Sequence, residues 1–130
     1  MAAGLTVGAV TAYSFLRWKP SRVEIHGNSM APTLLPGDWA LATAAGRLRI
    51  GHVVVVEHPE RPGHEMVKRL TAGPGDLAPD GRPLGAGEWW VEGDDPGQST
   101  DSRHFGPVPR TSIIERVRLV YWPTNRRRLV

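Results

Sequence analysis

Cysteine is absent from the 130 residues of this chain. A protein without thiols has no cysteine nucleophile, cysteine zinc site, iron–sulfur ligation or disulfide, and the redox state of its compartment cannot be inferred. Lysine is scarce as well, because only Lys19 and Lys68 occur among the 16 basic residues. Arginine keeps its proton in proteins, whereas a desolvated lysine can lose it. A lone lysine inside the domain is therefore a candidate base.

Sustained helical periodicity is missing after residue 20, so we expect helix only at the amino terminus and in a single turn near Ser29. The 15 glycines and 12 prolines are spread along the chain and indicate many turns. Apolar residues instead alternate with polar ones, as Val23 and Ile25 do, or form short runs between turns. The fold class is predicted to be mainly β, a small antiparallel sandwich or partly closed barrel. The six expected strands cover residues 22–26, 39–43, 52–57, 65–70, 89–92 and 116–121.

Long apolar runs are limited to residues 2–16, which carry no charge. About 20 apolar residues cross a bilayer, but Tyr13 and Trp18 suit the headgroup region and extend the anchor. Nothing basic precedes the run, which argues against a cleaved signal peptide, and a buried core helix is the other alternative. We therefore predict that residues 1–19 form an N-terminal membrane anchor, a single transmembrane helix, and that residues 20–130 form the β domain.

A strong excess of positive charge is also lacking, since the formal net charge is only +3. The basic run at residues 126–128 closes the chain and is expected to be solvated. No nucleic-acid partner is predicted. The segment H-E-M-V-K at 64–68 lacks the second histidine of an H-E-x-x-H zinc site, and no metal or cofactor is predicted.

Three clusters of polar residues are candidates for chemistry. Each also has a plain structural interpretation, either as a turn fixed by glycine and proline or as a loop whose Asp and Ser side chains bond their own backbone. They are G-N-S-M-A-P-T-L-L-P-G-D at 27–38, M-V-K-R-L at 66–70, and G-D-D-P-G-Q-S-T-D-S-R-H-F-G-P-V-P at 93–109.

Ser29 has the setting of a nucleophile. It follows an expected strand and lies between Gly27 and Pro32, on a tight turn that would hold its hydroxyl at a fixed angle. Position 31 is alanine, so the turn is not the G-x-S-x-G elbow of an α/β-hydrolase. A serine hydroxyl needs a base within hydrogen-bond reach. None of the five histidines is identified as that base by its position, and a Ser/His hydrolase remains an alternative.

Lys68 is the better candidate for the base. It lies in the middle of an expected strand, flanked by Met66, Val67 and Leu70. An ordinary lysine has a pKa of about 10.4 and is only about 0.04% neutral at pH 7. Burial disfavours the ammonium and lowers that pKa. If the side chain points inward, the neutral amine is accessible.

Together the three clusters resemble the signal peptidase I family, serine endopeptidases that use a Ser/Lys dyad to remove leader peptides. The order and spacing of the motifs agree over residues 23–122. The small size is similar to the mitochondrial inner membrane proteases and to the maturation proteases of nickel superoxide dismutase. Departures include Asp95 where Asn is common and the lack of the large insertion of some bacterial enzymes. The matching positions are Ser29, Met30, Pro32, Thr33, Leu34, Gly37 and Asp38, then Lys68, Arg69, Pro74, Gly75 and Asp76, then Gly93, Asp94, Ser99, Asp101, Ser102, Arg103, Gly106, Val108 and Pro109.

The resemblance implies a role for each matched position. Ser29 would attack the scissile carbonyl, and Lys68 would take its proton and later return one to the leaving amine. The Ser29 backbone N–H would hold the oxyanion. Support is implied from residues of the third cluster, with Ser99 orienting the lysine and Asp101, Arg103 and Asp94 bracing the loop. The group on the oxyanion or substrate side comprises Gly27, Asn28, Met30 and Pro32.

The resemblance also implies a partner and a location. The partner is a precursor polypeptide, bound as an added strand and cut after small residues, and membrane lipid contacts the N-terminal segment. The protein is expected to be a single-pass membrane protein with an extracytoplasmic catalytic domain. A cytoplasmic face is the alternative, because Arg17, Lys19 and Arg22 follow the apolar segment. The alternative functions are a cytoplasmic-facing maturation protease for a specific precursor, such as nickel superoxide dismutase, and a noncatalytic peptide-binding module.

Overall fold

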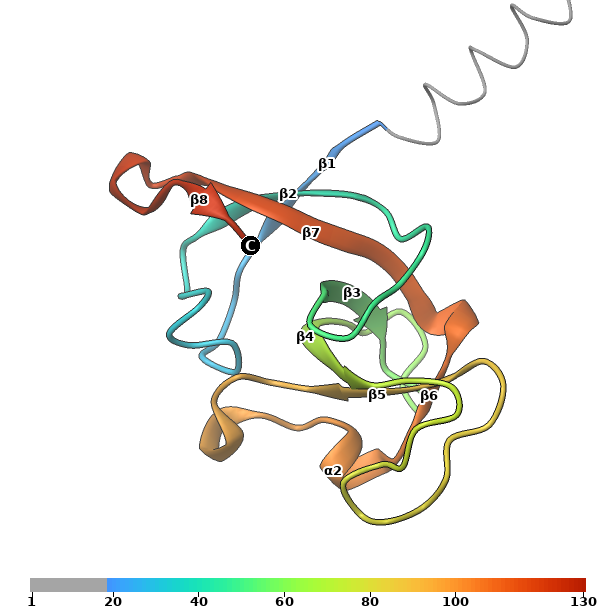
Figure 1. The fold of residues 1–130 in the computed structure, drawn as a ribbon. Coiled ribbons are helices and arrows are strands. Elements are labelled where there is room, and N and C mark those ends of the chain that lie inside the picture. The colour runs from blue at the N-terminus through green and yellow to red at the C-terminus, as the bar shows by residue number, and fades with distance from the viewer. Residues whose placement is uncertain (1–18) are drawn as a thin grey trace, which may run out of the picture.

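A strongly curved antiparallel sheet organises residues 19–130, the part of the chain that the computed structural model describes (Figure 1). Its short strands are separated by turns that contain glycine and proline, as the composition predicts. The strands are β1 (Ser21–Glu24), β2 (Trp39–Ala44), β3 (Val53–Glu57), β4 (Glu65–Ala72), β5 (Glu88–Glu92), β6 (Val108–Pro109), β7 (Ile113–Trp122) and β8 (Arg128–Leu129).

The strand order is β1-β2-β7-β3-β4-β5-β6, and β8 pairs with β7. All of these pairings are antiparallel. The prediction of a mainly β fold is therefore confirmed, and the paired strands form a half-barrel. The long strand β7 joins the two halves of the path, because it pairs with β2 on one side and with β3 on the other.

Two apolar clusters form most of the core and lie on opposite faces of β3, since alternate valines of that strand belong to each. The four valines Val53–Val56 are all buried, because β3 has neighbours on both edges and packing on both faces. One apolar cluster joins β2, β3 and β7 to Met30 and Leu34, so the turn that carries Ser29 is packed onto the core. A second cluster joins β3, β4 and β5, and Trp90 forms a third with Ala72, Ala78 and Leu84. Lys68 thus lies in a strand between two well-packed regions.

All six expected strands are present, but helix is not confined to the amino terminus and the Ser29 turn as predicted. The expected amino-terminal helix falls on residues outside the described part of the chain. A short helix, α2 (Ser102–Phe105), is capped by Asp101, whose side chain accepts from the Arg103 N–H. Four residues are too few to show a helical period, so the sequence pattern could not identify it. Near Ser29 the chain forms a turn, in which the Leu34 N–H donates to the Met30 carbonyl at 2.9 Å.

The basic run at the carboxyl end is not simply solvated. Arg126 donates to both carboxylate oxygens of Asp38, at 2.7 and 2.9 Å, and Asp38 is buried. Burial opposes ionisation of Asp38, but the hydrogen bonds from Arg126 and the Leu35 N–H outweigh it and lower the pKa of the carboxyl group. The chain end is thereby fixed against the turn that follows Ser29.

The expected membrane anchor falls almost wholly on residues 1–18, which lie outside the described residues. Between residues 19 and 130 no helix has the length and apolar character that crossing a membrane requires. The domain boundary at residue 19 stays a prediction.

Candidate active site

The turn that carries Ser29 is shaped by Gly27. Gly27 has φ +74°, a backbone conformation that glycine adopts without strain. After it, the Ala31 N–H donates to the Asn28 carbonyl at 3.1 Å and closes the turn. Met30 is 2% exposed and anchors the turn in the core, which leaves Ser29 half-buried at its start. The hydroxyl therefore sits on a backbone that is held on both sides.

Lys68 points into the protein from the middle of β4 and is 4% exposed. Its Nζ donates to Ser99 Oγ at 2.9 Å. Burial lowers the pKa of the amine, and Arg103 lowers it further, while the charge of Asp101 raises it; the net pKa is below the usual value for lysine. The inward orientation expected from the sequence is what the structure shows.

A short chain of hydrogen bonds behind Lys68 determines which way its protons point. Ser99 Oγ donates to Asp101 Oδ2 at 2.6 Å, so the single hydroxyl hydrogen of Ser99 is committed to the carboxylate. Its lone pairs are left to accept from Lys68, whose Nζ must supply the hydrogen. When the amine is neutral, its lone pair is therefore directed away from Ser99.

Asp101 is the centre of this arrangement and is fully buried. Besides Ser99, it accepts from the Gly93 N–H at 2.9 Å and from the Arg103 guanidinium at 2.6 and 3.0 Å. Desolvation opposes its ionisation, but the bonds from Arg103, Ser99 and the backbone hold its pKa far below the usual range. Asp101 is therefore a fixed negative charge near the lysine.

The third cluster also touches the Ser29 turn directly. The Asp95 N–H donates to the Ser29 carbonyl at 2.9 Å. A side chain at Gly93 would collide with both the Ser99 hydroxyl and the Ser29 carbonyl, so only glycine fits between them. This close approach connects the backbone of Ser29 to the hydrogen-bond partner of Lys68.

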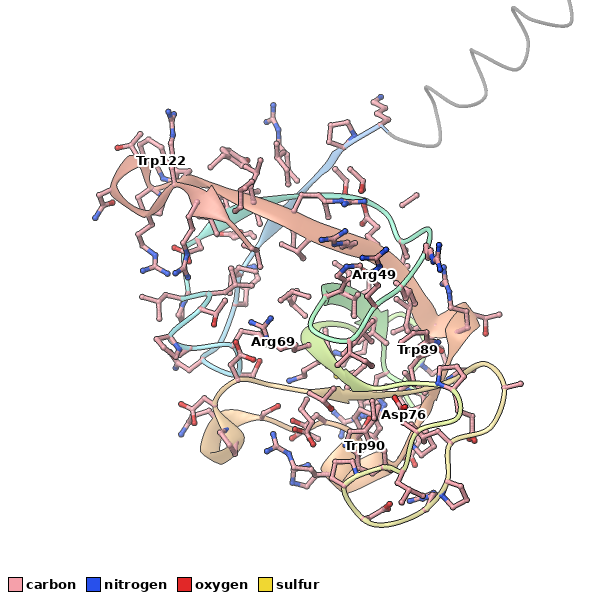
Figure 2. All side chains as sticks on the ribbon, in the orientation of Figure 1. Arg49, Arg69, Asp76, Trp89, Trp90 and Trp122 are labelled. Carbon is pink, nitrogen blue, oxygen red and sulfur yellow. The ribbon has the colours of Figure 1, made fainter. Side chains whose placement is uncertain are left out.

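Asp94, in the third cluster, is hydrogen-bonded to one residue from each of the other two clusters. Its carboxylate accepts two bonds from the Arg69 guanidinium, at 2.9 and 2.8 Å, and one from Thr33 Oγ1 at 2.6 Å. These bonds and the charge of Arg69 lower the pKa of Asp94. Arg69, labelled in Figure 2, also donates to the Gly51 carbonyl at 2.8 Å. The planar guanidinium thus joins β4 to the third cluster through Asp94, and Asp94 in turn accepts from Thr33 in the Ser29 turn.

Ser29 and Lys68 line one cavity of about 440 Å³, which we call the Ser–Lys cavity. No hydrogen bond joins the two side chains in the described part of the chain, which is common before a substrate draws such groups together. Gly27, Asn28 and Met30 also line it, whereas Pro32 is exposed and outside the lining. The remaining lining comes from residues 24–26 and 65–67, from His58, Arg61 and His64, and from Gln98 and Thr100.

Two free strand edges border the Ser–Lys cavity. β1 pairs only with β2, and residues 25–28 continue beyond it along the cavity. Residues 65–68 of β4 pair with β3, but pairing with β5 begins only at Arg69. An extended peptide between these two edges would find backbone partners on either side.

The histidines among the described residues are not hydrogen-bonded to Ser29 in the way that an alternative base would be. His26, His58 and His64 line the cavity, but among the described residues none of their rings is hydrogen-bonded to Ser29. His58 instead packs against Phe105 with ring centroids 4.9 Å apart, and His104 accepts from the Asp101 N–H within the α2 cap. Residues 19–130 contain no group of three His, Asp or Glu side chains that could hold a metal ion.

Comparison with known proteins identifies a family whose model matches this chain. The family model described as "Signal peptidase, peptidase S26" matches residues 1–79 and 77–122 of the chain. These matches include every residue of the three clusters.

Individual relatives agree with the family model. The chain is 38% identical to "Mitochondrial ATP-independent inner membrane protease subunit 1a" of Arabidopsis thaliana over 123 residues, which cover 82% of this chain and 73% of the relative. It is 32% identical to "Mitochondrial inner membrane protease subunit 1" of Homo sapiens, over 79% of this chain and 70% of the relative. It is 29% identical to "Mitochondrial inner membrane protease subunit 2" of Mus musculus, over 95% and 79% respectively.

Proposed function

Because this chain belongs to the signal peptidase family, peptidase S26, we propose that it is a serine endopeptidase that removes leader peptides after small residues. Ser29 is the nucleophile and Lys68 the general base. The observation that carries the proposal is a buried lysine of lowered pKa that faces the same cavity as a half-buried serine on a fixed turn. Burial disfavours the ammonium and so shifts Lys68 toward the neutral amine that a general base requires.

The proposed reaction begins when Ser29 Oγ attacks the scissile carbonyl carbon and its proton passes to Lys68 Nζ. The carbonyl oxygen becomes an oxyanion, which the Ser29 N–H stabilises, and the exposed Asn28 amide is the candidate second donor. The C–N bond then breaks as the Lys68 ammonium gives its proton to the leaving amine. Water attacks the acyl ester with Lys68 again as the base, and Ser29 regains its hydrogen.

The hydrogen-bond chain behind Lys68 supports this cycle. Ser99 holds one N–H of the amine in both protonation states, so the lone pair stays directed away from Ser99. Asp101 stabilises the ammonium that forms during attack, while burial favours its return to the neutral amine. The two effects oppose each other and keep the lysine able to exchange its proton in both directions.

The free edges of residues 25–28 and 65–68 support an extended substrate. A peptide paired with both edges would pass its scissile bond between Ser29 and Lys68. We propose that the side chains before the cut are small because the peptide lies close to the walls of the cavity. The partner is therefore a precursor polypeptide whose leader is unfolded near the cleavage site.

Membrane association is proposed because the relatives are subunits of inner membrane proteases. The apolar run at residues 2–16 would be the anchor, with the catalytic domain on the extracytoplasmic side. A carboxyl-terminal tag tested for protease accessibility in intact and permeabilised cells decides the side. Protection in intact cells would favour the cytoplasmic alternative, a maturation protease for a specific precursor.

Cleavage of a fluorogenic leader peptide by the full chain in detergent tests the function. Ser29→Ala and Lys68→Ala should each abolish cleavage, while alanine at the exposed positions His64 or His104 should leave most of it. Circular dichroism checks that each variant is folded. An active Lys68→Ala protein beside an inactive histidine variant would contradict the proposal and favour a Ser/His hydrolase.

The pH dependence of the wild-type rate gives an independent test. Since the base works as the neutral amine, kcat/KM should rise with pH, and the rise should begin below the range of an ordinary lysine because burial lowers the Lys68 pKa. A rise centred at about 6.5 would instead indicate histidine. Peptide binding without cleavage at any pH would favour a noncatalytic module.

A further inference from the structure

A second hollow, which shares no residue with the Ser–Lys cavity, is lined almost entirely by cations. It has a volume of about 340 Å³ and is bordered by Ala45, Arg47, Arg49, His52, Arg116 and Arg118. We call it the arginine hollow. No carboxylate lines it, although the chain as a whole carries 13 acidic residues and a net charge of only +3.

The arginine hollow is built by two separate segments. Arg116 and Arg118 lie two residues apart on β7, at an irregularity in its pairing with β2, and both line the hollow. Arg47, Arg49 and His52 come from the connection between β2 and β3. Figure 2 shows Arg49 beside β7, among other side chains with nitrogen at their tips.

The connecting segment holds its shape through several hydrogen bonds. The Gly51 N–H donates to the Leu70 carbonyl at 2.8 Å, and the Leu70 N–H donates to the His52 carbonyl at 2.9 Å. The Arg49 N–H donates to His52 Nδ1 at 3.2 Å. In the neutral ring the hydrogen therefore sits on Nε2, which makes this atom a donor. The side of the hollow opposite β7 is thus fixed to the backbone of β4.

Three of the four arginines in the hollow have no carboxylate partner among the described residues. Within residues 19–130, Arg47, Arg49 and Arg116 form no ion pair, and the buried Nε–H of Arg116 has no hydrogen-bond acceptor. Arg118 donates to Thr43 Oγ1 at 2.9 Å. Burial, Arg118 and Arg49 lower the pKa of Arg116, and burial and the same cluster of arginines lower the pKa of His52.

Such a cluster is unfavourable unless something compensates for it. Arginine remains charged in proteins, so the repulsion cannot be relieved by loss of a proton. A buried donor without an acceptor costs about 1–3 kcal/mol. An anion in the hollow would neutralise the repulsion between the guanidinium groups that line it.

We propose that the arginine hollow is a binding site for a phosphate group. Guanidinium groups pair with phosphate through two parallel N–H bonds, and a phosphate offers enough oxygen atoms for several such groups together. The arginine side chains that line the hollow supply the donors. The phosphate belongs either to a lipid headgroup or to a soluble phosphate, because both present the same oxygens.

Thermal unfolding of the full chain in neutral detergent tests the proposal. Inorganic phosphate and dihexanoyl phosphatidylglycerol are titrated separately, each against sodium chloride at matched ionic strength. A ligand that binds only the folded state raises the unfolding midpoint with its concentration. Arg49→Gln and Arg116→Gln should each weaken the apparent affinity at least about tenfold, since each removes a charge-assisted donor. Because Arg49 is exposed, its variant is expected to fold.

The matched control removes two charges elsewhere, in Arg22→Gln/Arg128→Gln, both of which are exposed positions outside the hollow. This double variant should keep the ligand-dependent rise of the unfolding midpoint. The Ser29→Ala protein should keep it as well, so that this test is independent of the test of the protease function. Saturation by the lipid at lower concentration would assign a headgroup, and saturation by inorganic phosphate alone would assign a soluble ligand. A midpoint that follows only ionic strength, or an equal loss in the control, would overturn the proposal.

Discussion

In the Ser–Lys cavity, Lys68 reaches the buried carboxylate of Asp101 through Ser99, and Arg103 pairs with the same carboxylate. In the arginine hollow, by contrast, Arg49 and Arg116 line a space that no carboxylate lines. Both regions gather basic residues on the same sheet. They differ in the type of basic residue and in whether a carboxylate lies close to it.

The difference shows what each residue type is suited for. A buried lysine escapes the cost of desolvation by giving up its proton, and the amine that results is a base. A guanidinium keeps its charge, so a cluster of them stays positive until an anion arrives. One region thus fits proton transfer, and the other fits the binding of a charged group.

The largest effect is expected from Lys68→Arg, which puts a permanent charge into the Ser–Lys cavity and so removes the difference between the two regions. Without a neutral amine the Ser29 hydroxyl has no proton acceptor, and kcat/KM for leader peptide should fall by about 10²- to 10⁴-fold. The assay is cleavage under saturating and limiting peptide, with circular dichroism to confirm folding. A variant with wild-type turnover would show that Lys68 is not the base.

The matched control is the next residue of the same strand, Arg69→Lys. It keeps a positive charge but loses the two-bond pairing with Asp94. Stability should drop by about 1 kcal/mol, while cleavage should change far less than in Lys68→Arg. Equal losses of activity in the two variants would indicate that β4 responds to any change, not to the loss of a base.

The strands could be predicted from the sequence because each bears a local signal. Alternation at Val23 and Ile25 and the valine run of β3 each indicate a strand without reference to the rest of the chain. β6 and β8 have two residues each and α2 has four, which is too short for any period to show. Their positions depend on contacts with distant strands, as in the pairing of β8 with β7.

A smaller effect is expected from Ser99→Ala, which sharpens the account of the lysine. Nζ loses the acceptor that orients it, and a hydrogen bond to a charged group contributes about 1.5–3 kcal/mol. We expect kcat to fall by about 10- to 100-fold with KM nearly unchanged, because Ser99 is absent from the cavity lining. Thr100→Ala, at the adjacent lining position, is the control and should affect KM more than kcat. A changed KM for Ser99→Ala would indicate that Ser99 acts on the substrate.

The site, like the strands, could be predicted only where a residue has a local signal in the sequence. Ser29 and Lys68 were identified as candidates from their own surroundings, and the three motifs added their supporting residues. The contact between Gly93 and Ser29 carried no sequence signal, nor did the link from Asp94 to Thr33, which lies 61 residues away. The arginine hollow could not be predicted, because residues 47–52 and 116–118 are brought together only by the sheet, whereas the basic run at 126–128 is visible in the sequence itself.

The smallest expected effect concerns the charge left in the arginine hollow. In phosphate-free buffer of low ionic strength, Arg49→Gln should raise the free energy of unfolding by about 0.2–1 kcal/mol, the scale of charge interactions at exposed sites. At about 1 M salt the Debye length is about 3 Å, so the gain should disappear. Arg82→Gln is the counterpart, because Arg82 is paired with Asp80 at 2.9 Å and its loss should not stabilise the protein. Urea unfolding of both variants measures whether each substitution raises or lowers the free energy of unfolding. If Arg49→Gln destabilises the protein as well, the hollow must contain a compensating charge, and the contrast between the two regions would be lost.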